Sequence, residues 1–179
     1  TAPAPLVEDL DALSLPAWDL MDPRAYPAAP HQLFYKRFPT APVITSRGCR
    51  FNCSYCASAV VWGHRYRLRS VGDVVAEARH LARGYGVREL HVVDDDFTAN
   101  EDRVLALCDA LASADLGLVW SLPNGIRTDT VTPRLAAGFF PEFAAGGGQR
   151  LFVGIDQPFW NEPGALVFRG PERAARMHQ

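Results

Sequence analysis

Residues 43–56 read VITSRGCRFNCSYC and place three cysteines directly after a short run that favours a β-strand. Val43 to Ser46 form the run, and Gly48 ends it. Cys49, Cys53 and Cys56 then follow with the spacing C-x3-C-x2-C. Thiolates are soft metal ligands, so a strand that leads into such a loop predicts a metal site at the end of that strand.

Apolar runs alternate with helical patterns along the chain from this stretch onward. Ser70 and Asn100 are predicted to cap two helices, Gly84 and Gly86 to end the first of them, and Thr132 to cap a short third helix. Strands are expected over residues 43–46, 89–93, 116–122 and 151–155, with residues 165–168 as a fifth candidate. This alternation predicts parallel βαβ units with right-handed crossovers. Four or five strands are too few for the usual eight-stranded barrel, so we expect an α/β fold with an open, partial (β/α) barrel.

The segment ahead of the first strand has a different composition. Residues 1–42 hold eight of the 14 prolines and none of the 14 glycines. Proline fixes φ and removes a backbone donor, so this segment is expected to be extended. Its Leu, Trp, Phe and Tyr content is too high for a free linker. We therefore predict a proline-rich strap over residues 1–42, anchored by Trp18 and Phe34, followed by a core over residues 43–179.

The overall composition narrows the classes of partner. The chain has 179 residues, of which 48% are hydrophobic, and a formal net charge of −2. A chain of this length can bury on the order of 70% of its unfolded surface, which allows a real core. The slight negative charge argues against nucleic acid as a partner, and no apolar run approaches the roughly 18 residues of a membrane span. Three clustered cysteines, rather than a spread disulfide framework, predict a reducing compartment and hence a cytoplasmic protein.

The number of nearby ligands bears on which metal the cysteines hold. A structural zinc site needs four protein ligands, and only three cysteines are local. Cys108 falls on an apolar helix face and is expected to be a small core residue, while His64 is expected in a solvated basic turn. Three ligands on a four-iron cluster leave one iron open for an exogenous ligand. Both zinc and an iron–sulfur cluster remain open from the residues alone.

The cysteine run, with Tyr55 just before the last cysteine, resembles the signature of radical S-adenosylmethionine (SAM) enzymes. Its surroundings resemble the subgroup that carries a cobalamin-binding domain ahead of the radical SAM core. The residues that carry this likeness are 44–49 (ITSRGC), 67–70 (RLRS), 94–98 (DDDFT), 107–109 (LCD) and 154–156 (GID). Residues 15–20 (LPAWDL) resemble the connector between the two domains, so the resemblance covers roughly residues 10–156. It implies a TIM-like partial barrel of the radical SAM type, shorter than the family's six βα units.

The resemblance implies a role for each site residue. Cys49, Cys53 and Cys56 would hold a [4Fe–4S] cluster, and SAM would chelate the open iron. Reduction of the cluster by an electron donor would cleave SAM to methionine and a 5′-deoxyadenosyl radical. The SAM contacts would be Tyr55 near the adenine, Asp95 and Asp96 at the methionyl amine, Arg127 at the methionyl carboxylate, and Asp156 at a ribose hydroxyl or the amine. Asp156 stands where the family usually has glutamate.

The implied function is that of a radical SAM enzyme acting on a small molecule, and methyl transfer is common in this subgroup. Cobalamin would come from a domain or a partner chain outside these residues. Two alternatives stay open: a non-catalytic module whose cysteines hold zinc or an iron–sulfur cluster, and a remnant that binds SAM without turnover.

Several of the same residues also have a purely structural interpretation. The Asp94–Asp96 run could be a solvated turn at the start of a helix, and Arg127 could pair with Asp129 on the surface. Trp120 is expected to be a core aromatic, and His91 to serve packing or lie at an edge. Gly146–Gly148 lacks the Lys-Ser/Thr and the helix of a phosphate-binding loop, so it is expected to be a flexible loop.

Overall fold

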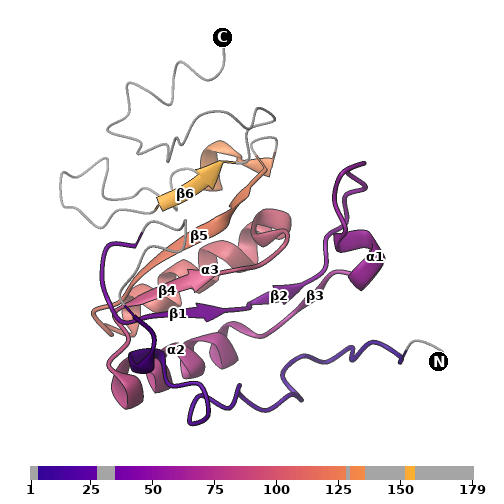
Figure 1. Ribbon diagram of the computed structural model, residues 1–179. Helices are drawn as coiled ribbons and strands as arrows, with labels where there is room; N and C mark the ends of the chain where they lie inside the picture. The colour runs from indigo at the N-terminus through magenta and orange to yellow at the C-terminus, as the bar shows by residue number, and fades with distance from the viewer. Residues whose placement is uncertain (1–3, 28–34, 128–129, 136–151, 156–179) are drawn as a thin grey trace.

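The computed structural model describes residues 4–27, 35–127, 130–135 and 152–155, the last of these as backbone only (Figure 1). Its main sheet has four parallel strands in the order β1-β4-β5-β6. These strands are β1 (Thr40–Val43), β4 (Glu89–Val92), β5 (Val119–Ile126) and β6 (Phe152–Ile155). The prediction of a parallel α/β sheet with four strands is therefore confirmed. The fifth candidate strand, residues 165–168, lies outside the described residues.

The first strand ends earlier than the sequence predicted. β1 stops at Val43, and the chain then forms a separate antiparallel ribbon in which β2 (Ser46–Arg47) pairs with β3 (Arg67–Leu68). The predicted strand over residues 43–46 was wrong in its extent, because Thr45 and Ser46 bond to the side chain of Asp94 instead of continuing the parallel ladder. At its far end β5 extends to Ile126, past the predicted end at Leu122, with a register shift against β6 between these two residues.

Local capping signals position the two long helices, α2 (Val71–Tyr85) and α3 (Glu101–Ser113). Ser70 Oγ accepts from the Asp73 N–H at 3.1 Å, and Asn100 Oδ1 accepts from the Arg103 N–H at 3.0 Å, as predicted. Gly86 ends α2 in a left-handed conformation, with φ of 65°. Gly84 lies inside α2, so the prediction that it ends the helix was wrong. A single helical glycine costs only about 1 kcal/mol, which the packing of α2 offsets.

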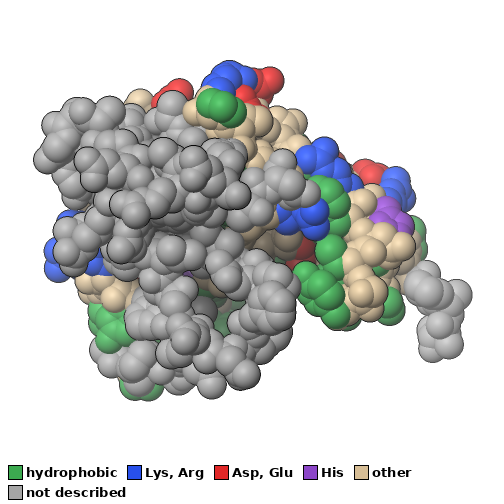
Figure 2. Space-filling view, turned by 90° about the horizontal axis from the view of Figure 1, so that it is seen from above, with side chains coloured by type: hydrophobic (Ala, Val, Ile, Leu, Met, Phe, Trp, Pro, Cys, Tyr) green, Lys and Arg blue, Asp and Glu red, His purple; other side chains and the backbone are tan. Residues whose placement is uncertain are grey.

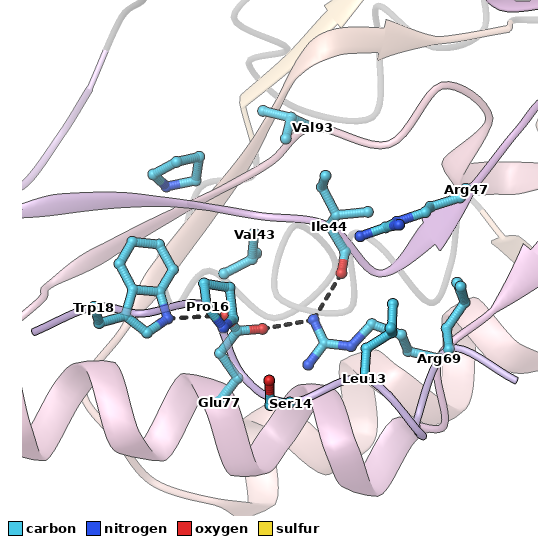
Figure 3. Close-up of a pocket in the computed structure, with 12 residues that line it drawn as sticks. Leu13, Ser14, Pro16, Trp18, Val43, Ile44, Arg47, Arg69, Glu77 and Val93 are labelled. Carbon is cyan, nitrogen blue, oxygen red and sulfur yellow. Dashed lines mark hydrogen bonds and ion pairs between the residues drawn. The ribbon is translucent and has the colours of Figure 1, made fainter. Parts of the chain in front are cut away.

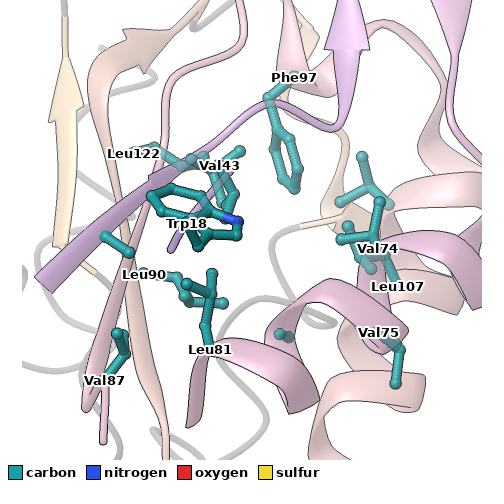
Figure 4. Packing of buried hydrophobic residues seen from close by; sticks show 14 of the residues in the cluster. Trp18, Val43, Val74, Val75, Leu81, Val87, Leu90, Phe97, Leu107 and Leu122 are labelled. Carbon is teal, nitrogen blue, oxygen red and sulfur yellow. The ribbon is translucent and has the colours of Figure 1, made fainter. Parts of the chain in front are cut away.

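A short 3-10 turn (η2, Phe97–Ala99) leads into α3, and helices α2 and α3 lie together on one face of the parallel sheet (Figure 1). The buried core fills the space between these helices and the sheet (Figure 4). Four of its fully buried leucines come from α2, β4, α3 and β5, and a fifth lies beyond β5: Leu81, Leu90, Leu107, Leu122 and Leu135. Trp120 and Cys108 are partly buried and pack against this core, so both predictions of a core role are confirmed.

The proline-rich segment contacts α2 and the residue that caps it. A short 3-10 turn (η1, Pro23–Ala25) interrupts it. Trp18 is buried, and its indole N–H donates to Glu77 Oε1 at 3.1 Å, which confirms it as an anchor. The Asp11 carboxylate accepts from the Ser70 N–H at 2.8 Å. Phe34, the other predicted anchor, lies outside the described residues.

A cavity of about 400 Å³ lies between this segment and β1. Figure 3 shows Glu77 at its base, bonded to both Trp18 and Arg69, while Arg69 also donates to the carbonyl of Ile44. In the part of the chain described, no helix has the length and apolar character needed to cross a membrane.

Candidate metal centre

The cysteine loop projects beyond the carboxyl end of β1 (Figure 1). It runs from β2 to α1, a short helix over Ser58–Trp62. Gly48 begins the loop with φ of 94°, and a Cβ at this position would lie 2.0 Å from the carbonyl oxygen of Arg65. Only glycine accepts both the positive φ and this close approach of two backbone segments. Gly48 therefore fixes where Cys49 begins.

The three predicted ligands differ in their exposure. Cys49 and Cys53 are half-buried, Cys56 is exposed, and all three are free thiols. The Cys56 N–H donates to the Cys53 carbonyl at 3.1 Å, and the Ser58 N–H donates to Cys56 Sγ at 3.5 Å. Burial raises the pKa of the Cys49 thiol, and the nearby charges of Asp96 and Asp95 raise it further. The loop thus holds three sulfurs at one end of the sheet, next to acidic groups.

Two of these acidic groups lie shortly after β4 and contact the cysteine loop or the start of α1. Asp95 is exposed and accepts from Ser58 Oγ at 3.1 Å. Asp96 is only 4% exposed, and its Oδ2 lies 4.0 Å from Cys49 Sγ and 3.8 Å from Arg50 Nε. The interpretation of the whole run as a solvated turn is therefore wrong, because Asp94 and Asp96 are both buried.

Arg127 reaches the same loop from the end of β5. Its guanidinium carbon lies 3.8 Å from the centroid of the Phe51 ring, and Nη1 donates to Cys53 Sγ at 3.6 Å. The alternative partner Asp129 lies outside the described residues, and so does Asp156, the residue after β6. The structure thus brings Asp95, Asp96 and Arg127 to the three cysteines.

The exposed surface around the loop mixes apolar and basic groups. Figure 2 shows hydrophobic and Lys or Arg side chains gathered on the projecting lobe. Tyr55 is 81% exposed there, and Val60 on α1 is 87% exposed. The apolar character comes from the loop and from α1, none of whose residues is buried.

The residues present suit a cluster with three protein ligands. Among the described residues, no group of three or more His, Cys, Asp or Glu side chains is gathered closely enough for a single metal ion. A four-iron cluster makes a different demand, because each cysteine binds its own iron. The candidate fourth ligands for zinc lie elsewhere: Cys108 packs against the core from α3, and His64 is exposed in the turn after α1. The soft donor set on one loop fits the cluster.

Sequence reasoning missed several residues that build this site. Arg50, Phe51 and Ser58 contact the predicted site residues, as described above. Asn124 of β5 donates from Nδ2 to the carbonyls of Val93 at 2.9 Å and Asp94 at 3.3 Å. Ligand sites form at the carboxyl ends of parallel strands, so the position of Asn124 near the end of a predicted strand was a usable signal. Ser58 carried no such signal.

Comparison with known proteins identifies the fold and the family. A profile described as the radical SAM superfamily matches residues 43–159. An uncharacterized methyltransferase of Pyrococcus horikoshii is 30% identical over 168 residues, which cover 94% of this chain and 33% of that protein. The cytidylyl-2-hydroxyethylphosphonate methyltransferase of Streptomyces wedmorensis is 34% identical over 123 residues, covering 65% of this chain and 22% of that protein. The chain therefore spans about a third or less of these relatives.

The radical SAM methyltransferase TsrM of Kitasatospora setae, solved with cobalamin and a [4Fe–4S] cluster bound, shares the fold. It is 24% identical, with a TM-score of 0.51, over 65% of this chain and 21% of that chain. A second structure of TsrM, with tryptophan substrate and a SAM analogue, gives a TM-score of 0.52 at 22% identity over 77% of this chain and 27% of that chain. The likeness supports a partial barrel of the radical SAM type, as predicted. With its cysteine loop at the carboxyl edge of a parallel sheet and the profile match over most of its core, this chain belongs to the radical SAM superfamily.

Proposed function

We propose that this chain is the cluster-binding and SAM-binding part of a radical SAM enzyme of the methyltransferase type. One observation carries the proposal: the cysteine loop, the carboxylates after β4 and the guanidinium after β5 meet at one edge of the sheet. This is the edge at which parallel α/β sheets bind their ligands. The methyltransferase type is supported by the names of the relatives described above.

In this proposal Cys49, Cys53 and Cys56 hold a [4Fe–4S] cluster. When bound, the cluster supplies the electron that splits SAM reductively. This chain's own residues bind and orient SAM. Asp95 and Asp96 present negative charge to the methionyl ammonium, and such charge-assisted hydrogen bonds are the stronger kind.

The remaining proposed contacts lie around these carboxylates. Arg127 offers a planar guanidinium that matches the methionyl carboxylate, and its five N–H donors allow this in addition to its contact with Cys53. Tyr55 lies beside Cys56 on the loop and is assigned to the adenine. Asp156, which follows β6, is assigned to a ribose hydroxyl or the amine.

The rest of the proposal concerns the substrate, the electron donor, the source of cobalamin, the cellular compartment and the division of the chain. The substrate is a small molecule, an electron donor reduces the cluster, and cobalamin comes from another domain or a partner chain. The setting is the reducing cytoplasm. The division into a strap over residues 1–42 and a core over residues 43–179 stays a prediction.

Anaerobic reconstitution with iron and sulfide tests the proposal. We expect a brown protein with iron and sulfide in equal amounts, and an electron paramagnetic resonance (EPR) signal of the reduced cluster that changes when SAM is added. Cys53→Ala should lose both the colour and the EPR signal. Cys108→Ala is the matched control because Cys108 lies on α3 against the core, and it should retain the cluster.

Three results would contradict the proposed function. A colourless protein that holds one zinc tightly would favour the non-catalytic module. If Cys53→Ala bound as much iron as the unchanged chain, Cys53 would not be a ligand and the proposed cluster site would be wrong. If a cluster formed but its EPR signal did not change on addition of SAM, the chain would be an iron–sulfur module that does not bind SAM at the cluster. This result would contradict the enzymatic proposal.

A further inference from the structure

Asp94 is the buried carboxylate of the run that has no part in the proposed site. It is 3% exposed, and its oxygens accept hydrogen bonds from Thr45 and Ser46, where the chain passes from β1 into β2. Oδ1 accepts from the Thr45 N–H at 2.6 Å. Oδ2 accepts from Thr45 Oγ1 at 2.6 Å and from Ser46 Oγ at 2.6 Å. Three short hydrogen bonds therefore join the end of β4 to the residues that lead into the cysteine loop.

Two arginines also donate hydrogen bonds to this segment. Arg103 of α3 donates to the Thr45 carbonyl at 2.8 Å. Arg69, just ahead of α2, donates from its side chain to the Ile44 carbonyl at 2.8 Å and from its N–H to the Thr45 carbonyl at 3.0 Å. The backbone groups of Thr45 thus bond to partners from three separate parts of the chain: Asp94, Arg69 and Arg103. Such a fully bonded buried network fixes a local conformation.

A carboxylate is the side chain that suits this place. An ionised carboxylate only accepts hydrogen bonds, and each of its oxygens takes more than one. Burial raises the pKa of Asp94, while the hydrogen bonds from Ser46 and Thr45 oppose that shift. An amide in the same place would direct its NH₂ group at Thr45 Oγ1 and Ser46 Oγ, so both hydroxyls would have to reverse from donors to acceptors, and the negative charge that strengthens the three bonds would be lost.

We propose that Asp94 is a positioning residue that fixes the base of the cysteine loop to the end of β4. Only Arg47 and Gly48 separate Ser46 from Cys49, and only Asp95 separates Asp94 from Asp96. Both connections are short, so the Asp94 contacts set where Cys49 lies relative to Asp96. The inference rests on the proposed function, because holding the cluster is the task assigned to the loop.

The test replaces Asp94 by its isosteric amide, Asp94→Asn, and uses Glu89→Gln as the matched control. Glu89 is also a buried carboxylate of this β4 region, but at the opposite end of the strand, where it accepts from the N–H groups of Lys36 at 2.6 Å and Arg37 at 2.8 Å. We expect both variants to lower the melting temperature. Only Asp94→Asn should weaken retention of the reconstituted cluster against a chelator, roughly tenfold by analogy with residues that orient metal ligands.

A second readout does not depend on the cluster. In the cluster-free protein, Asp94→Asn should speed alkylation of Cys49 while leaving Cys56 unchanged, because Cys56 is already exposed. Glu89→Gln should leave both rates unchanged. If the unchanged chain assembles no cluster, the proposed function fails, and the Cys49 rate still decides the role of Asp94.

Two results would overturn the inference. One is an Asp94→Asn protein that keeps its cluster and alkylates Cys49 at the original rate. The other is a Glu89→Gln protein that loses its cluster equally. Should Asp94→Asn not fold, Ser46→Ala removes one of the three donors, and it should shift both readouts in the same direction by a smaller factor.

Discussion

Four thiols in this chain have the same chemistry in sequence and different surroundings in the structure. Cys49, Cys53 and Cys56 lie on the loop, half-buried or exposed, whereas Cys108 packs against the core from α3. Burial, with the charge of Asp109, raises the pKa of Cys108 to about 12. A thiol must ionise to react, so these surroundings separate a metal-ligand set from a structural cysteine.

Alkylation at pH 8 should therefore distinguish the folded protein's cysteines. With a pKa of about 12, only roughly one Cys108 in ten thousand is a thiolate at pH 8, against about one in ten for the ordinary value of 9.0. We expect iodoacetamide to label Cys56 rapidly and Cys108 last, as read by mass spectrometry of peptides. The labelling of Cys108 should rise about tenfold for each pH unit below 12.

Denaturant supplies the control, since it should make all four rates similar. Equal labelling of Cys108 and Cys56 in the folded protein would contradict its place in the core.

The aspartate run shows how far single residues can be predicted. The resemblance to radical SAM enzymes implied that Asp95 and Asp96 contact the methionyl amine, and in the structure Asp96 lies near Cys49 and Asp95 accepts from Ser58. The sequence could not distinguish Asp95 from Asp96 and gave Asp94 no role of its own, since three identical neighbouring side chains do not show in which direction each one points. The buried partners Thr45 and Ser46 give Asp94 its direction, and they lie 49 and 48 residues away along the chain.

At the scale of elements, capping residues in the sequence predicted the two long helices, whereas nothing in the local sequence predicted the antiparallel β2–β3 ribbon. Ser70 and Asn100 cap α2 and α3 through contacts only three residues away, which a sequence displays directly. The β2–β3 ribbon has two residues in each strand, too few for any periodicity. Its geometry depends on Gly48 and Arg65, which meet only after folding.

Gly48→Ala should therefore disrupt the ribbon and the loop that it carries. The added Cβ would meet the backbone carbonyl of Arg65 at 2.0 Å, and a backbone atom cannot move aside as a side chain does. We expect a loss of about 3 kcal/mol in the free energy of unfolding, measured with urea, together with loss of the reconstituted cluster.

Gly117→Ala is the matched control. Its φ of 63° is also positive, but no atom lies within 4 Å of the added Cβ. It should cost about 1 kcal/mol and keep the cluster. Equal effects of the two substitutions would show that the close approach to Arg65 does not matter.

At the scale of the whole molecule, the alternation of strands and helices predicted the sheet because each βα unit carries its own apolar pattern. The strap was predicted from composition, and Trp18 confirms its anchoring to α2. Contacts between distant segments carried no such signal. The bond from Trp18 to Glu77 and the Arg69–Glu77 ion pair join residues that only the folded chain brings together.

The exposure of the loop leads to a prediction for the isolated chain. Cys56 is exposed and Tyr55 is 81% exposed, so the part of the proposed site that these two residues form faces solvent. Radical chemistry needs a site that excludes water and competing hydrogen donors. We expect the reconstituted 179-residue chain, reduced with dithionite, to form little 5′-deoxyadenosine, within a few-fold of Cys53→Ala. Liquid chromatography with mass spectrometry measures the product, and the EPR response to SAM shows separately that the cofactors are bound. Rapid, substrate-dependent formation of 5′-deoxyadenosine would mean that these residues already shelter the reaction by themselves.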